Sequence, residues 1–346
     1  MTLTWHLSKA VFIRILAVVL ALGGLALALD MVESASKVLA RSDGGLMRYI
    51  MLRLPMILAA VAPVALIVGP VLTFLTLAGR SEFTIYRASG VTTYRMLLSL
   101  APLAAVLGAG LFVLNDRVVP TMEGRLISWL ESREAATAGA FWAHTSKGVA
   151  QADASTPGGD LLVGLDVFET DARGLMTARI TAKVARFRDG QWIVNGATRL
   201  VPGKGGAKDF SGQIWDTPLT PANVRALAAP SRTVAGNIAG KVLQGDWAGN
   251  RADSFYRMRV LRGYASTLLP VLMILLAAPA AFGTRRAGGM GRMGAGAVVL
   301  GFGFLLIDGM MSSLGETGAM PPYLAAFGAT ALFAAIGGYA LVTLEE

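Results

Sequence analysis

Six stretches of the sequence are apolar over lengths that suit a helix crossing a membrane. The longest uncharged one covers residues 54–78, which is 25 residues, and about 20 apolar residues are enough to cross a bilayer as a helix. The other stretches are 15–29, 96–114, 266–282, 293–314 and 323–344. The pattern therefore predicts six membrane-spanning helices, and an even number of spans places both termini on the same side of the membrane.

A long polar block, residues 115–264, separates the third apolar stretch from the fourth. Within it, apolar and polar residues alternate, which is the period of a strand with one buried face. The alternating segments are 160–168, 176–187, 191–200 and 209–215. The sequences DARG and RDG between them favour hairpin turns. Strands of this length and spacing predict an antiparallel sandwich or an open jelly roll, and the alternation alone does not choose between the two.

Helices are predicted at both ends of this block. At its start, NDRVVPTMEGRLISWLESREAA continues the third span as a polar helix in which Arg125 and Trp129 share a face. Near its end, LTPANVRALAAP and TVAGNIAGKVLQGDW predict short helices that lead back to the membrane. The expected organisation is three spans in 1–114, an extramembrane domain in 115–264 and three spans in 265–346.

The composition agrees with an integral membrane protein and excludes a water-soluble globule. Hydrophobic residues make up 54% of the chain and charged residues 15%, and the mean hydropathy is +0.57. The chain has no cysteine, so neither disulfides nor thiolate metal sites are available. The expected fold class is an α-helical membrane protein with six transmembrane helices and an inserted β-rich domain.

The distribution of lysine and arginine in the short loops predicts the orientation. Lys9 and Arg14 before the first apolar run also fit a signal peptide, but no small-x-small processing site closes that run, so we expect it to be retained as the first span. The short segments on the side of the termini carry eight basic residues and those on the other side carry four. Because the basic side faces the cytoplasm, the large block is expected outside, which is the periplasm in a Gram-negative cell. The eight residues are Lys9, Arg14, Arg80, Arg87, Arg95, Arg285, Arg286 and Arg292.

The sequence RSEFTIYRASGVTTYR, residues 80–95, interrupts two membrane-length apolar runs and predicts a short surface helix. Phe83, Tyr86 and Arg87 fall at helical spacing. Ser81 can cap the first turn, Glu82 lies at the positive end of the helix dipole and Gly90 can end the helix. Such a helix is either a solvated connector or a docking element for another protein.

Two further sets of charged residues stand near or within the apolar runs. Lys37 and Arg41 are four residues apart, so a helix continuing from the first span places both on one face. They can anchor the helix at the membrane surface or contact an anionic lipid headgroup. Asp308 lies well inside an apolar run, where a charge is costly, so we expect a polar lining, a partner or a protonated state.

No catalytic or nucleic-acid-binding pattern emerges. His6 and His144 fall on opposite sides of the membrane in this topology, and neither GxSxG nor HExxH occurs. The basic loop GTRRAGGMGR lacks the GxxxxGK[ST] pattern of a P-loop. The net charge of +9 is explained by the basic loops, and the polar block has no dense basic run, so nucleic acid is not an expected partner.

Several short sequences spread along the chain resemble those of one family. They are RSE followed by an apolar stretch and ASG within 80–95, LDMVE at the end of the first span, VVP after the third, and FLLIDGMMSSLG with MPPYLAA near the end. Together they are similar to the LptF/LptG family of lipopolysaccharide export permeases. The resemblance covers nearly the whole chain, and LALALDMVE is more similar to the LptG branch.

The resemblance implies a permease subunit of an ABC transporter that extracts lipopolysaccharide from the inner membrane. It implies a periplasmic β-jellyroll, no bound cofactor, and ATP used by a separate LptB-like ATPase dimer. The other implied partners are an LptF-like permease subunit and the LptC-like and LptA-like proteins of a periplasmic bridge. The residues expected to dock the ATPase are Arg80, Ser81, Glu82, Phe83, Tyr86, Arg87 and Gly90, and those expected near the lipid are Asp30, Lys37, Arg41, Arg125 and Asp308.

A second hypothesis is a membrane-anchored periplasmic scaffold that binds a protein partner and transports nothing. A scaffold needs neither a polar cavity nor dependence on an ATPase, whereas a permease needs charged residues around a space that lipid can reach.

Overall fold

The chain divides into two compact units in a computed structural model. One unit comprises Met1–Glu123 and Met258–Glu346, and the other comprises Gly124–Arg257. The predicted inserted domain, 115–264, extends beyond the second unit at both its first and its last residue. The structure describes residues 2–39, 45–80, 82–131, 140–145, 148–156, 158–171, 175–203, 206–228, 234–282 and 289–345.

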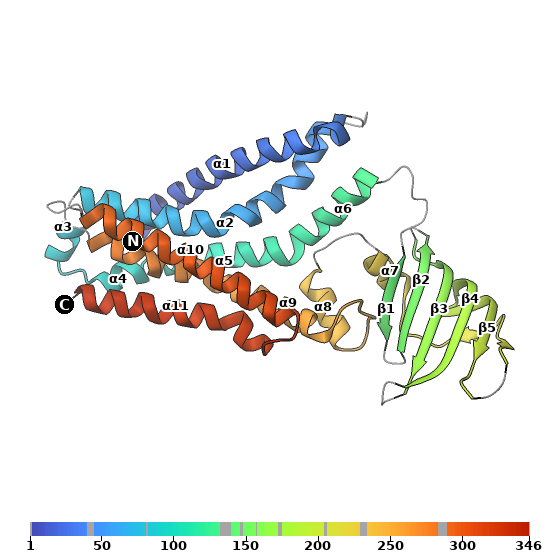
Figure 1. Ribbon diagram of the computed structural model, residues 1–346. Coiled ribbons are helices and arrows are strands. Elements are labelled where there is room, and N and C mark those ends of the chain that lie inside the picture. The colour runs from blue at the N-terminus through green and yellow to red at the C-terminus, as the bar shows by residue number, and fades with distance from the viewer. Residues whose placement is uncertain are drawn as a thin grey trace. The chain divides into compact units, whose positions relative to one another are not determined.

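The first unit is built from helices long and apolar enough to cross a membrane. The described residues contain six of them, which confirms the predicted number and makes the chain a multi-pass membrane protein. Figure 1 shows the start of α1 and the end of α11 at the end of this unit that carries the short helices α3 and α4. The long helices are α1 (Thr2–Leu39), α2 (Gly45–Gly79), α5 (Ala101–Val113) with its continuation, α9 (Asp253–Ala277), α10 (Gly289–Glu316) and α11 (Pro322–Glu345).

The third span begins later than the apolar run that predicted it. The first residues of that run form the separate helix α4 (Thr93–Leu98), and α5 starts at Ala101. Pro102 lies in the first turn of α5, where a residue without a backbone N–H is tolerated and continuation from the preceding helix is not. Hydropathy does not detect such a break because the end of α4, Met96–Leu98, is as apolar as α5.

Helix α2 lies against several other spans and holds the unit together. At Gly69 the backbone of α1 comes so close that a Cβ atom would lie 2.5 Å from Ile15 Cγ1, and a Cβ at Gly301 of α10 would lie 2.5 Å from Ile67 Cγ1. Small residues allow helices in lipid to approach closely and gain dispersion contacts. Both neighbours, Ile15 and Ile67, are buried in the main apolar core of this unit.

The second unit contains one antiparallel sheet in the described residues. The strand order is β1-β2-β3-β4-β5-β6, and β7 also pairs with β5. The long strands β3, β4 and β5 confirm three predicted segments, whereas 209–215 forms only the short β6 and β7. The strands are β1 (Phe141–Thr145), β2 (Gly148–Ser155), β3 (Leu161–Thr170), β4 (Met176–Arg188), β5 (Gln191–Leu200), β6 (Lys208–Asp209) and β7 (Ile214–Trp215).

In the described residues the strands form one meander and no second sheet of a sandwich. The jelly-roll topology is not confirmed. The apolar face of the sheet is covered by residues that follow the strands. Leu219, and Val224 of helix α7 (Pro221–Ala228), belong to the same buried core as Trp192 of β5. The indole Nε1 of Trp192 donates to the carbonyl of Leu219 at 2.7 Å. The alternation shows that one face is buried but does not identify the element that covers it.

The two short helices predicted at the end of the polar block are present as α7 and α8 (Gly236–Leu243). Asn223 of α7 is buried and its amide exchanges two hydrogen bonds with the backbone of Ala248, at 3.1 and 2.9 Å. These bonds hold the segment around Ala248 against α7, since an unpaired buried amide is costly.

Candidate functional site

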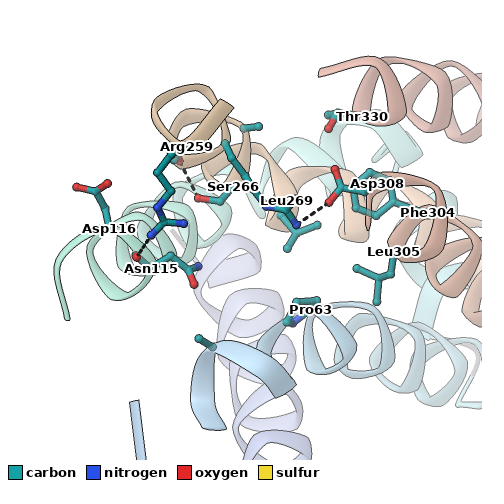
Figure 2. Close-up of a pocket in the computed structure, with 14 residues that line it drawn as sticks. Pro63, Asn115, Asp116, Arg259, Ser266, Leu269, Phe304, Leu305, Asp308 and Thr330 are labelled. Carbon is teal, nitrogen blue, oxygen red and sulfur yellow. Dashed lines mark hydrogen bonds and ion pairs between the residues drawn. The ribbon is translucent and has the colours of Figure 1, made fainter. Parts of the chain in front are cut away.

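A polar cavity of about 220 Å³ lies among the membrane-spanning helices. Helices α2, α9, α10 and α11 contribute to its wall, together with the segment that follows α5 (Figure 2). Charged groups at this depth of a membrane protein face the bundle interior or a water-filled space, because hydrocarbon does not solvate them. The polar residues of its wall are Asn115, Asp116, Arg259, Arg262, Ser266 and Asp308, with Thr330 on α11.

Asp308 of α10 pairs with Arg262 of α9. The Nη2 atom of Arg262 lies 3.2 Å from Oδ2 of Asp308, and the two side chains are 41% and 21% exposed. The acid that the sequence placed alone in an apolar run therefore has both a polar lining and a charged partner. Charge neutralisation allows both groups to stay at a depth where either alone is destabilising.

Arg259, one turn before Arg262, binds the backbone of a π-helix. The π-helix η1 (Leu114–Val118) connects α5 to α6 (Val119–Glu131), and Arg259 Nη2 donates to the carbonyl of Asn115 at 2.7 Å (Figure 2). A π-turn inserts an extra residue into a helix and is frequent at functional sites. The guanidinium thus fixes η1 to α9 at the wall of the cavity.

A glycine and a proline shape the wall of this cavity. Gly263 faces η1, and a Cβ atom there would lie 3.3 Å from Phe112 and 3.8 Å from Asp116. On α2, Pro63 has no backbone N–H to donate to the carbonyl of Ala59, and both residues line the cavity. The volume of about 220 Å³ and the polar groups of the wall allow the cavity to hold water.

A second polar cluster joins α1 to α2. The Nε atom of Arg53 donates to the two carboxylate oxygens of Asp30 at 3.0 and 2.9 Å, and the Tyr49 hydroxyl also bonds to Asp30. Tyr49 in addition bonds to Ser34 Oγ at 2.9 Å. Asp30 was expected near the lipid, and its carboxylate is engaged by two side chains of α2.

The remaining residues expected near the lipid are Lys37, Arg41 and Arg125. Lys37 lies in α1 but its side chain is outside the described residues, and so is all of Arg41. Arg125 is exposed on α6, in the second compact unit. Among the expected residues whose side chains the structure describes, Asp308 is the one that lines the cavity.

The segment expected to dock an ATPase forms the predicted short helix. Helix α3 (Glu82–Ala88) ends before Gly90, whose φ of +83° is a left-handed conformation that favours glycine. The amide of Val91 donates to the carbonyl of Tyr86 at 3.1 Å, which closes the end of the helix. Ser81 lies outside the described residues, as do the side chains of Phe83 and Arg87.

The faces of α3 have different environments. Tyr86 packs against the main apolar core, whereas Ile85 is 65% exposed. Glu82 lies 3.9 Å from Arg80, whose side chain is 73% exposed, so this ion pair contributes little to stability. Tyr86 therefore anchors the helix, and the other side is available for contact.

Sequence analysis missed the basic partners of the acids. The sequence alone did not identify Arg53, Arg259 or Arg262 as residues of a site. The spacing of Arg259 and Arg262, three residues apart, indicates that both lie on one helix face, but it does not identify Asn115 and Asp308 as their separate partners.

Comparison with curated proteins gives no significant match. Comparison with family models matches residues 5–343 to the family described as lipopolysaccharide export system permease LptF/LptG. The matched range includes the apolar core of the helical unit and the whole sheet. The expected resemblance is confirmed, and the chain belongs to the LptF/LptG family of lipopolysaccharide export permeases.

Proposed function

We propose that this chain is the transmembrane permease subunit of an ATP-driven transporter that extracts lipopolysaccharide from the inner membrane. The observation that carries the proposal is the family match over residues 5–343, which includes six membrane-length helices and the inserted sheet. The LALALDMVE sequence favours the LptG branch, so the second permease subunit of the complex is LptF-like.

The energy for transport comes from a separate LptB-like ATPase dimer, and this chain binds neither ATP nor another cofactor. The docking site comprises Arg80 and helix α3 with its flanking residues. The packing of Tyr86 into the core and the exposure of Ile85 support this role, because a helix held on one face can transmit a push to the spans behind it.

The lipid path begins on the outer side of the spans and continues along the sheet, which lies in the periplasm. Lys37 and Arg41 contact phosphate groups of the lipid at the end of α1, and Arg125 follows on α6. The Asp30–Arg53 pair joins α1 to α2, and the Asp308–Arg262 pair joins α10 to α9. The packing of these helices changes during the transport cycle. LptC-like and LptA-like proteins then receive the lipid for outer-membrane assembly.

Reconstitution tests this function against the scaffold alternative. Proteoliposomes containing the chain, its LptF-like partner, the ATPase and fluorescent lipopolysaccharide should release lipid to an added bridge protein when ATP is supplied. An ATPase that binds but does not hydrolyse ATP is the control. Release that is equal with both ATPases, or absent while the bridge protein still binds, supports the scaffold.

A further inference from the structure

A second, apolar groove lies at one end of the helical unit and takes no part in the function proposed above. Its volume is about 770 Å³, and helices α4, α5, α9 and α11 form its wall. Large parts of this wall are exposed: the exposed fractions are 73% for Leu98, 53% for Val271 and 49% for Val342. All of its lining residues belong to the helical unit.

The lining residues place the groove at one surface of the membrane. On α11 the lining runs from Gly338 to Val342, next to the end of the last span at Thr343. On α9 it reaches Leu275, near the end of the fourth span at Ala280. At about 1.5 Å per helical residue, the groove enters the bilayer to a depth of roughly 7–13 Å, which is within one leaflet of a core about 30 Å thick.

The mouth of the groove is polar and carries a positive charge. Thr92, Tyr94 and Arg95 line it and precede the start of the third span at Ala101. Arg95 is exposed, and no ion pair of its side chain is found among the described residues. A guanidinium at this depth binds phosphate oxygens in a forked geometry, and Tyr94 can place its ring in the hydrocarbon and its hydroxyl in water.

The groove is open beside Gly338, the glycine that α11 contributes to its wall. A Cβ atom added at Gly338 would meet nothing within 4 Å, so the space beside this residue is not filled by the protein. Within a bilayer such a space is filled by hydrocarbon. We propose that the groove binds an acyl chain of an anionic glycerophospholipid, whose phosphate contacts Arg95.

Native mass spectrometry of the purified full chain tests this site with two probes. They are phosphatidylglycerol and phosphatidylcholine with the same acyl chains. The first bound phosphatidylglycerol should bind about fivefold more tightly than phosphatidylcholine, because one basic residue near an anionic surface contributes about 1 kcal/mol. Arg95→Gln should remove this preference, and Arg95→Lys should keep most of it.

A variant that fills the groove separates this site from general lipid adhesion. Gly338→Phe should reduce binding of both lipids about tenfold, since the ring occupies the acyl site. The matched controls are Arg292→Gln and Gly296→Phe on α10, both at exposed positions, and Gly296 also has nothing within 4 Å of an added Cβ. Both controls should bind lipid as the parent chain does.

Three results would overturn the proposal. They are equal binding of the two lipids by the parent chain, unchanged preference in Arg95→Gln, and unchanged binding in Gly338→Phe. A fourth result, loss of phosphatidylglycerol when the LptF-like subunit is added, would also overturn the proposal, because it would assign the groove to a protein helix. Because the readout is binding to the chain itself, the result does not depend on lipopolysaccharide transport or on the ATPase.

Discussion

At the scale of single residues, the ion pair between Arg262 and Asp308 has the clearest effect on stability. A lone charge on a membrane-spanning helix costs about 2.5–3.5 kcal/mol at the helix centre by insertion measurements. The partial exposure of both side chains to the polar cavity lowers that cost. The pair is therefore stable while α9 and α10 stay adjacent, and it weakens if they separate.

A double-mutant cycle with Arg262→Gln and Asp308→Asn should give a coupling energy of about 1–3 kcal/mol in the free energy of unfolding. Each single substitution leaves an unpaired charge in a poorly solvated place, whereas the double variant leaves none. Equilibrium unfolding of the purified chain in detergent measures the four proteins. The effect should appear without any ATPase or lipid present.

The sheet provides a matched control for this cycle. Arg179 and Asp166 form a pair of 3.0 Å with exposures of 46% and 29%, close to the values of the membrane pair. Its coupling energy should stay below about 1 kcal/mol because water screens it. Equal coupling in the two cycles would show that the cavity solvates Arg262 and Asp308 as well as bulk water does.

At the scale of elements, the local sequence of helix α3 explains where this helix begins, which side it buries and where it ends. Its acidic first turn, its core-facing Tyr86 and its terminal Gly90 all agree with one short helix. Its weak ion pair with Arg80 contributes little to folding. A substitution at Glu82 should therefore affect a partner more than the chain itself.

Glu82→Lys should abolish co-purification of the ATPase and leave the melting temperature of the chain within a few degrees of the parent. Reversing one partner of a desolvated charge pair costs at least the ~2–5 kcal/mol of removing it. Glu33→Lys is the control, since Glu33 is an exposed acid near the far end of α1. Retention of the ATPase at the parental level by Glu82→Lys would remove this helix face from the docking site.

The elements also show which parts of the fold the sequence predicts and which it does not. The spans have long apolar runs and the strands of ten residues or more alternate clearly, so six helices and the strands β3, β4 and β5 were predictable. Strands β1 and β2 were not predicted because their central residues are small. Ala143, Ala150 and Ala152 are buried, but alanine is only weakly hydrophobic, so the alternation is weak in these segments. The pairing of Asp308 with Arg262 joins residues 46 positions apart, and one sequence carries no signal for that contact.

At the scale of the whole molecule, the orientation of the spans links the separate proposals. The proposed function requires that the ATPase meets α3 in the cytoplasm and that the lipid meets the sheet in the periplasm. Six spans with α3, α4 and both ends of the helical chain at one end of the unit agree with this arrangement (Figure 1). The basic residues of the short loops on that side give the same orientation.

Cysteine labelling of intact spheroplasts tests the orientation without a background, because the chain has no native cysteine. An impermeant maleimide should label Gln191→Cys at the start of β5 at once, and should label Ser89→Cys and Arg292→Cys only after lysis. All three positions are exposed, so a missing signal reflects the membrane and not burial. Labelling of Ser89→Cys in intact spheroplasts would place α3 outside the cell interior, where no ATP-driven partner can reach it, and the proposed coupling of this helix to ATP hydrolysis would then be wrong.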